Sequence, residues 1–352
     1  MNLRDHRLLT LGVAIVLGAL LLPPSLSAAD KPLRLYGAGA TFPAPLFLSW
    51  LHAFNRLHPD IQPGYQPLNS SGGITDLEAG RVDFAGADYR LPEERASKIR
   101  GGIVQLPMAA AGIALIYNLP GIDSLRLSRK AVLGIFSGTI SRWNDPVITE
   151  TNPALNLPDL PITFVARMSG AGTSFNLTRH LSMISPEFRK TVGATVTPNW
   201  PAAIKERGVL LRGRGNDGVS SLVKGVQGAI GYVAYPHSDL ARIPAAAIEN
   251  KAGKIVAPNQ ASFAASMQAI GEKLSLDTLI NPPGEASYPM VAVSWMLVPN
   301  DLDDPAKQKA MVEIIDYALG PGQEIAERIG YIPFPPAIID FVRKGVGALR
   351  QP

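Results

Sequence analysis

The chain has 352 residues, of which 46% are hydrophobic and 18% are charged, so it holds enough apolar material for two cores. The formal net charge is only +4 and the basic residues are scattered, which argues against nucleic acid as a partner. The absence of cysteine excludes disulfides, thiolate metal sites and a lipid-attachment cysteine.

The first segment has the pattern of an export signal. Arg4 and Arg7 precede the uncharged run Leu8–Leu22, which is short for a membrane span, and Ser27–Ala29 supplies the small residues of a cleavage site. We therefore predict a cleavable signal peptide over residues 1–29 and a periplasmic location. An uncleaved membrane anchor is the alternative for this segment.

The chain that follows alternates strand-like and helix-like segments. We expect strands at Leu33–Tyr36, around Tyr65–Leu68 and at Val82–Ala85, and helices along Leu46–Leu57 and Gly72–Ala79. This order predicts α/β layering, with ligands bound at the carboxyl ends of the strands.

Two long apolar segments are expected to connect two domains. Ile103–Tyr117 suits a strand that leaves one domain and enters another, and Val291–Val298 suits a strand that carries the chain back. The second domain would contain a strand at Phe164–Ala166, a helix at Ser174–Ile184 and a strand at Ala229–Tyr235, and the first would regain a helix at Ala306–Leu319, opened by Asp304 and Pro305. We predict two α/β lobes joined by two crossings, with residues 30–110 and 290–352 in lobe 1 and residues 111–289 in lobe 2.

Three turns rich in glycine or hydroxyl residues precede helix-like segments: Gly37–Pro43, Asn69–Gly73 and Arg167–Ser174. A helix N-terminus offers unpaired N–H groups and the positive end of its dipole, and glycine lets a ligand approach the backbone closely. Together with Arg167 and Asp88, these turns predict a site for a small oxyanion.

Other chemistry finds little support. The glycine turn lacks the third glycine of a dinucleotide fingerprint, and the chain has no phosphate-cradling GxxxxGK[ST] loop and no GxSxG elbow. Ser221–Lys224 matches SxxK without its companion motifs, and the five histidines are dispersed, so we predict no catalytic residue, no metal and no cofactor. Structural roles for Asp88 as a cap and Arg167 as an ion-pair partner remain the alternatives.

Seven segments, in order along nearly the whole mature chain, carry a resemblance to a known family. They are Tyr36–Pro45, Tyr65–Gly73, Val82–Asp88, Ile135–Pro146, Gly172–Phe175, Gly215–Gly218 and Gly228–Tyr235. They closely resemble the periplasmic phosphate-binding proteins of high-affinity phosphate ABC transporters. The resemblance implies the two-lobed type II periplasmic-binding-protein fold, which closes on phosphate like a hinge.

The resemblance also implies a role for each site residue. Thr41 and Phe42 would offer backbone donors, with the Thr41 hydroxyl added, and Ser70 would offer its hydroxyl. Arg167 would supply a charged fork, and Gly172 and Thr173 would donate from the opposite lobe. Asp88 would accept a proton from phosphate, whereas sulfate has no proton to donate and would meet a repulsive carboxylate.

Two positions depart from the commonest family pattern, Arg-x-Asp-Gly-Ser-Gly-Thr. Ser169 replaces the aspartate that ordinarily orients the arginine, and Ala171 replaces the serine that ordinarily donates to phosphate. The resemblance thus predicts a phosphate site that lacks two of the family's side chains.

The predicted function is a non-enzymatic receptor, a monomer, that binds inorganic phosphate and delivers it to the permease and ATPase complex of an ABC transporter. Two alternatives use the same fold: a phosphate-ester hydrolase, and a paralogue that senses phosphate or binds another oxyanion.

Overall fold

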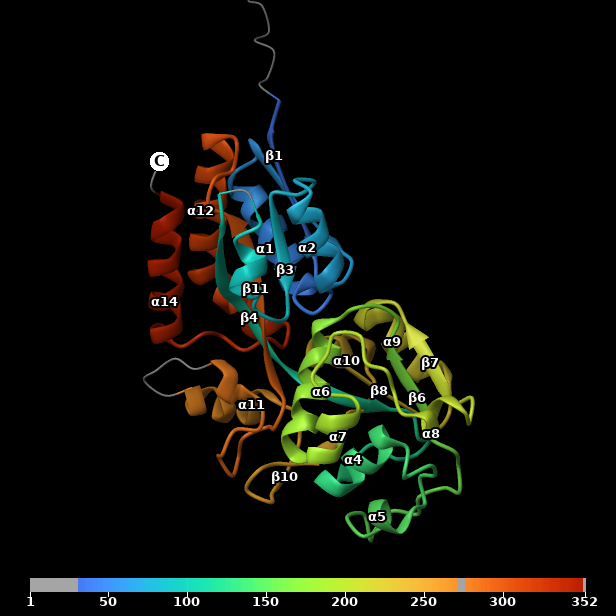
Figure 1. Ribbon diagram of the computed structural model, residues 1–352. Helices are drawn as coiled ribbons and strands as arrows, with labels where there is room; N and C mark the ends of the chain where they lie inside the picture. Colours follow the sequence, from blue (N-terminus) through green and yellow to red (C-terminus); the bar gives the residue numbers. More distant parts are fainter. Residues whose placement is uncertain (1–30, 100, 271–275, 351–352) are drawn as a thin grey trace, which may run out of the picture. The chain divides into compact units, whose positions relative to one another are not determined.

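The fold is built on a curled sheet whose strands come from distant parts of the sequence (Figure 1). The computed structural model describes residues 31–99, 101–270 and 276–350, and from Pro32 onward they pack as one unit. The predicted signal peptide, residues 1–29, lies outside the described residues. Within the described ranges, no helix is both long and apolar enough to cross a membrane.

The large sheet confirms the predicted α/β architecture with two lobes. Its strands, in spatial order, are β2 (Ile61–Pro67), β1 (Leu33–Gly39), β3 (Phe84–Ala87), β11 (Val291–Pro299), β4 (Ile103–Tyr117), β8 (Ala229–Ala234), β6 (Thr163–Arg167) and β7 (Leu210–Gly213). Strands β1, β2 and β3 run parallel, as do β6, β7 and β8, whereas β11 and β4 pair antiparallel to their neighbours. A small second sheet contains β5 (Arg126–Leu127), β9 (Ala247–Glu249) and β10 (Ile255–Val256).

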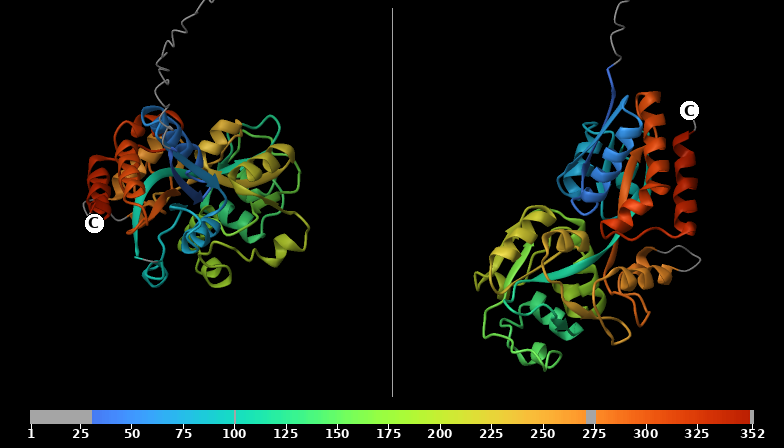
Figure 2. Two further views of the ribbon diagram at one scale, coloured as in Figure 1. Left: turned by 90° about the horizontal axis from the view of Figure 1, so that it is seen from above. Right: turned by 180° about the vertical axis from the view of Figure 1, so that it is seen from behind.

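Strand β4 belongs to both lobes, as its length predicted. Residues Ile103–Gly112 pair with β11, and residues Ile113–Tyr117 pair with β8, so the strand crosses from one group of strands to the other (Figure 1 and the right view of Figure 2). Gly112 lies at this change of partner, where a Cβ would overlap the ring of Phe263. The domain boundaries at 110/111 and 289/290 stay a prediction.

The helices flank the strands of each lobe. In the first lobe they are α1 (Ala44–Leu57), α2 (Ser70–Glu78), α3 (Glu93–Ala96), α12 (Pro305–Leu319), α13 (Gly322–Arg328) and α14 (Pro336–Val346). In the second they are α4 (Arg129–Ser137), α5 (Pro146–Thr149), α6 (Gly172–Ile184), α7 (Pro186–Thr191), α8 (Ala202–Lys205), α9 (Gly215–Gly225), α10 (Tyr235–Ala241) and α11 (Gln260–Met267). Helix α2 contacts β1 and β3, and α9 contacts β6, β7 and β8.

Local sequence signals explain where several helices begin. The Asn69 side chain accepts a hydrogen bond from the Gly72 N–H at 2.9 Å and caps α2. Asp304 accepts from the Ala306 N–H at 2.8 Å, so α12 begins as its Asp-Pro pair predicted.

Some predicted boundaries were wrong. The strand expected at Val82–Ala85 is Phe84–Ala87. Before it, the Asp83 N–H donates to the Tyr36 carbonyl at 2.7 Å, and the Asp83 side chain makes two further contacts. Its carboxylate accepts from the Tyr36 N–H at 2.7 Å and from Lys307 Nζ at 2.6 Å. Tyr235, placed at the end of a strand, instead begins α10 together with Pro236.

Each lobe has an aromatic core. In the first lobe Phe47 stacks on Trp50, whose indole N–H donates to the Gly322 carbonyl at 2.8 Å. In the second, the rings of Phe164 and Trp200 meet edge to face with centroids 4.6 Å apart. These cores hold the strand ends from which the candidate site is built.

Candidate anion-binding site

The structure brings the seven predicted residues together where the carboxyl ends of strands meet helix N-termini. Thr41 and Phe42 lie between β1 and α1, Ser70 begins α2, Asp88 follows β3, Arg167 ends β6, and Gly172 and Thr173 begin α6. All seven are buried. Because some come from the first lobe and others from the second, the site joins the two lobes.

Arg167 supplies a buried positive charge with a donor to spare. Its side chain is only 5% exposed, one guanidinium nitrogen donates to Thr173 Oγ1 at 2.6 Å, and another donates to Thr41 Oγ1 at 3.3 Å. The buried Nε has no hydrogen-bond partner among the described residues. Since buried polar groups are normally paired, this donor and the charge together favour a bound anion. The guanidinium is held by two hydroxyl groups and not by a carboxylate. This arrangement argues against the alternative that Arg167 is an ordinary ion-pair partner.

The Thr41 hydroxyl is surrounded by donors. Its oxygen accepts from the Asn216 backbone N–H at 3.2 Å, from Asn216 Nδ2 at 2.9 Å and from Arg167 at 3.3 Å. A hydroxyl has one proton and two acceptor lone pairs, so these neighbours occupy its oxygen and leave its proton to point elsewhere. The hydroxyl is therefore able to donate to an anion.

The N-terminus of α6 offers further donors. Thr173 Oγ1 accepts from Arg167, which leaves its own proton to donate. The N-cap residue is Ala171, which gives the helix no side-chain cap, although its own N–H donates to the Val196 carbonyl at 3.0 Å. The first N–H groups of a helix lack partners within the helix, so this end of α6 suits an anion.

Asp88 is a buried carboxyl that is poised to exchange a proton near neutral pH. Burial raises the pKa of Asp88 to about 7. A hydrogen bond from Ser294, the charge of Arg167 and a hydrogen bond with Ser70 lower this pKa, but burial has the larger effect. Ser294 Oγ donates to Asp88 Oδ1 at 2.9 Å, while Ser70 Oγ accepts from the Asp88 N–H at 3.3 Å. These bonds hold Asp88 between Ser294 on β11 and Ser70, another of the seven predicted residues.

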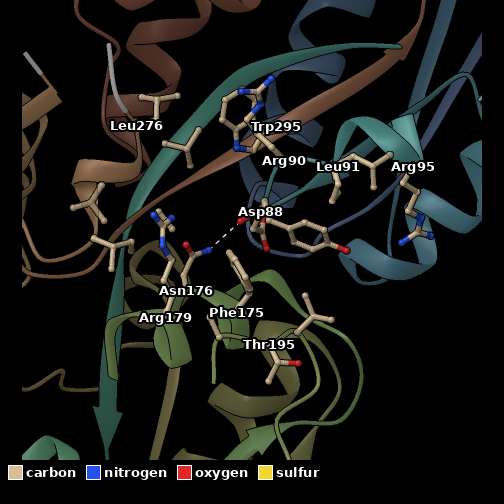
Figure 3. A pocket seen from close by; sticks show the side chains of 18 of the residues that line it. Asp88, Arg90, Leu91, Arg95, Phe175, Asn176, Arg179, Thr195, Leu276 and Trp295 are labelled. Atoms are coloured by element: carbon tan, nitrogen blue, oxygen red, sulfur yellow. Dashed lines mark hydrogen bonds between the residues drawn. The ribbon is translucent and has the colours of Figure 1, made fainter. Parts of the chain in front are cut away.

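Asn176 connects Asp88 to the opposite lobe. Its Nδ2 donates to the Asp88 carbonyl at 3.0 Å, drawn as a dashed line in Figure 3, and to the Gly172 carbonyl at 2.9 Å. Gly172 itself lies so close to Asp88 that a Cβ at that position would overlap the carboxylate side chain. Close backbone approach therefore requires glycine here.

Asp88 also borders a cavity of about 880 Å³ (Figure 3). Phe175, Asn176 and Trp295 line this cavity, and the Arg90 guanidinium lies over the Trp295 ring at 5.3 Å from its centroid. Of the seven predicted residues, Asp88 is the one that contributes to its wall. Figure 3 thus shows this cavity, with Asp88 in its wall.

Sequence reasoning missed the side chains that hold these groups in place. They are Asn176, Asn216, His237, Ser294 and Tyr331. Asn216 lies in Gly215–Gly218, one of the segments that carry the family resemblance, but the sequence alone assigned no role to its side chain. The Tyr331 hydroxyl donates to the Phe42 carbonyl at 2.5 Å across 289 positions, a contact that no local pattern signals.

The two departures from the family pattern differ in their surroundings. Ser169 is exposed in the turn between β6 and α6, whereas Ala171 is 1% exposed and faces the interior. Arg167 is held by Thr41 and Thr173, so hydroxyls take over its orientation where the family pattern has a carboxylate. The described residues contain no group of three or more side chains that could hold a metal ion.

Comparisons with known proteins find similar proteins over most of this chain. A model of the PBP superfamily domain matches residues 26–318. Phosphate-binding protein PstS of Xylella fastidiosa is 34% identical over 322 residues, which cover 90% of this chain and 85% of that protein. Phosphate-binding protein PstS of Haemophilus influenzae is 33% identical over 312 residues, with coverage of 87% and 90%. The phosphate-bound structure of a high affinity periplasmic phosphate-binding protein, PfluDING, has the same fold, with a TM-score of 0.70, 19% identity, and coverage of 89% of this chain and 93% of that one.

Proposed function

This chain belongs to the PstS family of phosphate-binding proteins within the PBP superfamily, and we propose that it is a periplasmic receptor that binds inorganic phosphate between its lobes and delivers it to an ABC transporter. The observation that carries the proposal is the buried Arg167 guanidinium, whose Nε has no partner among the described residues and whose neighbours, Thr41 and Thr173, retain protons to donate.

The proposed binding set keeps the seven residues in their expected roles. Six contribute donors: Thr41, Phe42, Ser70, Arg167, Gly172 and Thr173. Asp88 accepts a hydrogen bond from the O–H group that phosphate retains near neutral pH. Charge-assisted hydrogen bonds in a dehydrated site then supply most of the affinity.

The setting of the receptor is part of the proposal. We infer export by a cleaved signal peptide, a monomer in the periplasm, and docking on the permease and ATPase complex of a phosphate transporter. The names of the relatives support the transport role, and the contacts between the lobes support closure around the ligand.

Calorimetric titration of ligand-free protein with phosphate, arsenate and sulfate tests the proposal. Phosphate and arsenate, which both carry a proton near neutral pH, should bind with one site per chain, and sulfate should bind far more weakly. Tight sulfate binding, or no binding of phosphate after verified removal of ligand, would contradict it.

We also propose that the protein does not catalyse phosphate-ester hydrolysis. The site offers hydrogen-bond donors and one carboxyl, Asp88. Ser294 Oγ donates to this carboxyl at 2.9 Å, and we assign that contact to positioning, because in the proposed binding mode Asp88 accepts a hydrogen bond from phosphate and does not activate a nucleophile. Purified protein should show no phosphomonoesterase activity above that of the Asp88→Asn variant, whereas activity lost in that variant would support an enzyme.

Restoring the family's serine should tighten phosphate binding. Ala171 is buried at the N-cap of α6, where a hydroxyl could donate to the anion. Since a hydrogen bond to a charged group contributes roughly 1.5–3 kcal/mol, we expect Ala171→Ser to raise phosphate affinity about tenfold.

Calorimetry on Ala171→Ser and on the exposed control Ala203→Ser checks this expectation. A serine that instead capped α6 would raise the thermal stability of ligand-free protein and leave the phosphate affinity unchanged. That result would show that the hydroxyl faces the helix and not the ligand.

A further inference from the structure

His237 connects the two lobes through the residue that carries a candidate phosphate donor. It lies on α10 in the second lobe and is 4% exposed. Its Nε2 lies 3.0 Å from the carbonyl oxygen of Thr41, in the first lobe, and its Nδ1 lies 2.8 Å from Asp217 Oδ1, on α9. The imidazole therefore sits between two oxygens.

Both of these oxygens can only accept when Asp217 is ionised. A neutral imidazole has one N–H donor and one acceptor nitrogen, so it can satisfy either the carbonyl or the carboxylate, but not both. With Nε2 protonated, the Nδ1 lone pair faces the carboxylate, and with Nδ1 protonated, the Nε2 lone pair faces the carbonyl. Both contacts are hydrogen bonds only in the doubly protonated imidazolium.

We propose that His237, paired with Asp217, is a positioning residue that holds Thr41 against the second lobe in its doubly protonated form, so that phosphate is retained most tightly while the imidazole carries both protons. This inference rests on the proposed phosphate-binding function. It adds a residue that does not touch the anion, but acts through the backbone of one that does.

The charges around His237 agree with an ion pair. The hydrogen bond from His237 is the largest effect on the pKa of Asp217, which is lowered, and the charges of His237 and Arg167 lower it further. Lys224 lines the same groove as His237, but its Nζ donates to the Ala241 carbonyl at 3.1 Å. The nearby Tyr331 hydroxyl is engaged with the Phe42 carbonyl. The imidazole is therefore the group in this cluster whose two ring nitrogens both face oxygen acceptors.

The sign of the pH effect follows from the proton count. Closure around phosphate brings Thr41 to Nε2 and requires a second proton on the ring, so the closed state binds that proton more tightly than the open state does. Raising the pH removes it and leaves one of the two oxygens facing a lone pair. Closure, and with it phosphate affinity, should weaken as the pH rises.

Asp217→Asn separates this mechanism from a purely structural role. The amide N–H of asparagine can donate to Nδ1 of a neutral imidazole, whose Nε2–H then remains on Thr41. The variant should keep the connection between the lobes at every pH. Asp217→Asn also removes a negative charge, which changes the phosphate affinity by the same factor at every pH. The comparison therefore uses the slope of phosphate affinity against pH in each protein.

The experiment measures phosphate dissociation constants by calorimetry from about pH 5 to about pH 8, where imidazoles titrate. The proteins are wild type, Asp217→Asn, His237→Leu and the exposed control Asp239→Asn. Titration of phosphate and of Asp88 is common to all four and cancels in their ratios. Relative to Asp217→Asn, wild type should lose only a few-fold in affinity across this range. The Asp217 side chain is 85% exposed, and an exposed ion pair contributes roughly 0.2–1 kcal/mol.

The other two variants fix the interpretation. Asp239→Asn should follow wild type at every pH, and His237→Leu should be about tenfold weaker at the acidic end and parallel to Asp217→Asn. Parallel curves for wild type and Asp217→Asn would overturn the inference, even if His237→Leu failed to fold. Absence of phosphate binding in every protein would instead overturn the proposed function.

Discussion

Replacement of Arg167 by methionine should weaken phosphate binding about a thousandfold, which corresponds to about 4 kcal/mol. The reason is the environment of the guanidinium, which is 5% exposed and is the positive charge that the site presents to the anion. Methionine fills a similar volume, but leaves a phosphate charge buried without its counter-charge. Calorimetric titration of the variant checks the loss.

Arg214→Met is the matched control. Arg214 directly precedes α9, close to the site, and is exposed. Its replacement by methionine removes the same charge as Arg167→Met does. A surface charge changes affinity only modestly, so this variant should stay within a few-fold of wild type. Equal losses in the two variants would mean that net charge, and not the buried fork, drives phosphate binding.

Replacement of Asp88 by asparagine should reduce the ratio of phosphate affinity to sulfate affinity about a hundredfold or more. Phosphate loses one charge-assisted hydrogen bond, and sulfate loses one repulsive contact. Phosphate loses the carboxylate that accepts its proton, although the amide oxygen can still accept. Sulfate gains, because the amide replaces a carboxylate that has no proton to offer it above neutral pH. An unchanged ratio of the two affinities would show that Asp88 is not the discriminating group.

The pH dependence of sulfate binding gives a second measure of the same residue. Burial raises the pKa of Asp88 to about 7, so below this pH the carboxyl holds a proton that it can donate to sulfate. Above it, the carboxylate repels sulfate. Wild-type affinity for sulfate should therefore fall as the pH rises through about 7, while Asp88→Asn should stay flat by comparison and the exposed control Asp123→Asn should follow wild type.

The sequence by itself determined the strand–turn–helix units and the chemistry that each unit presents. The start of α12 follows from Asp304, because capping is a contact between residues two or three positions apart, whereas α2 begins at Ser70, two residues before the expected Gly72. The extent of β4 follows from its long apolar run, Ile103–Tyr117, which Pro107 and Gly112 interrupt without ending the strand. The motifs at Thr41, Ser70 and Arg167 could be found for the same reason, since a short segment carries each of them.

Only the tertiary structure decided how these units complete one another. Ser294 reaches Asp88 across 206 positions, and His237 reaches Thr41 across 196. Such contacts depend on where β11 and α10 come to lie, which is set by strand pairing and packing rather than by the residues beside each side chain. The burial of a side chain likewise depends on distant parts of the chain. The pKa of Asp88 moves to about 7 because the folded lobes exclude water from the carboxyl, and no property of the segment Val82–Asp88 contains that exclusion.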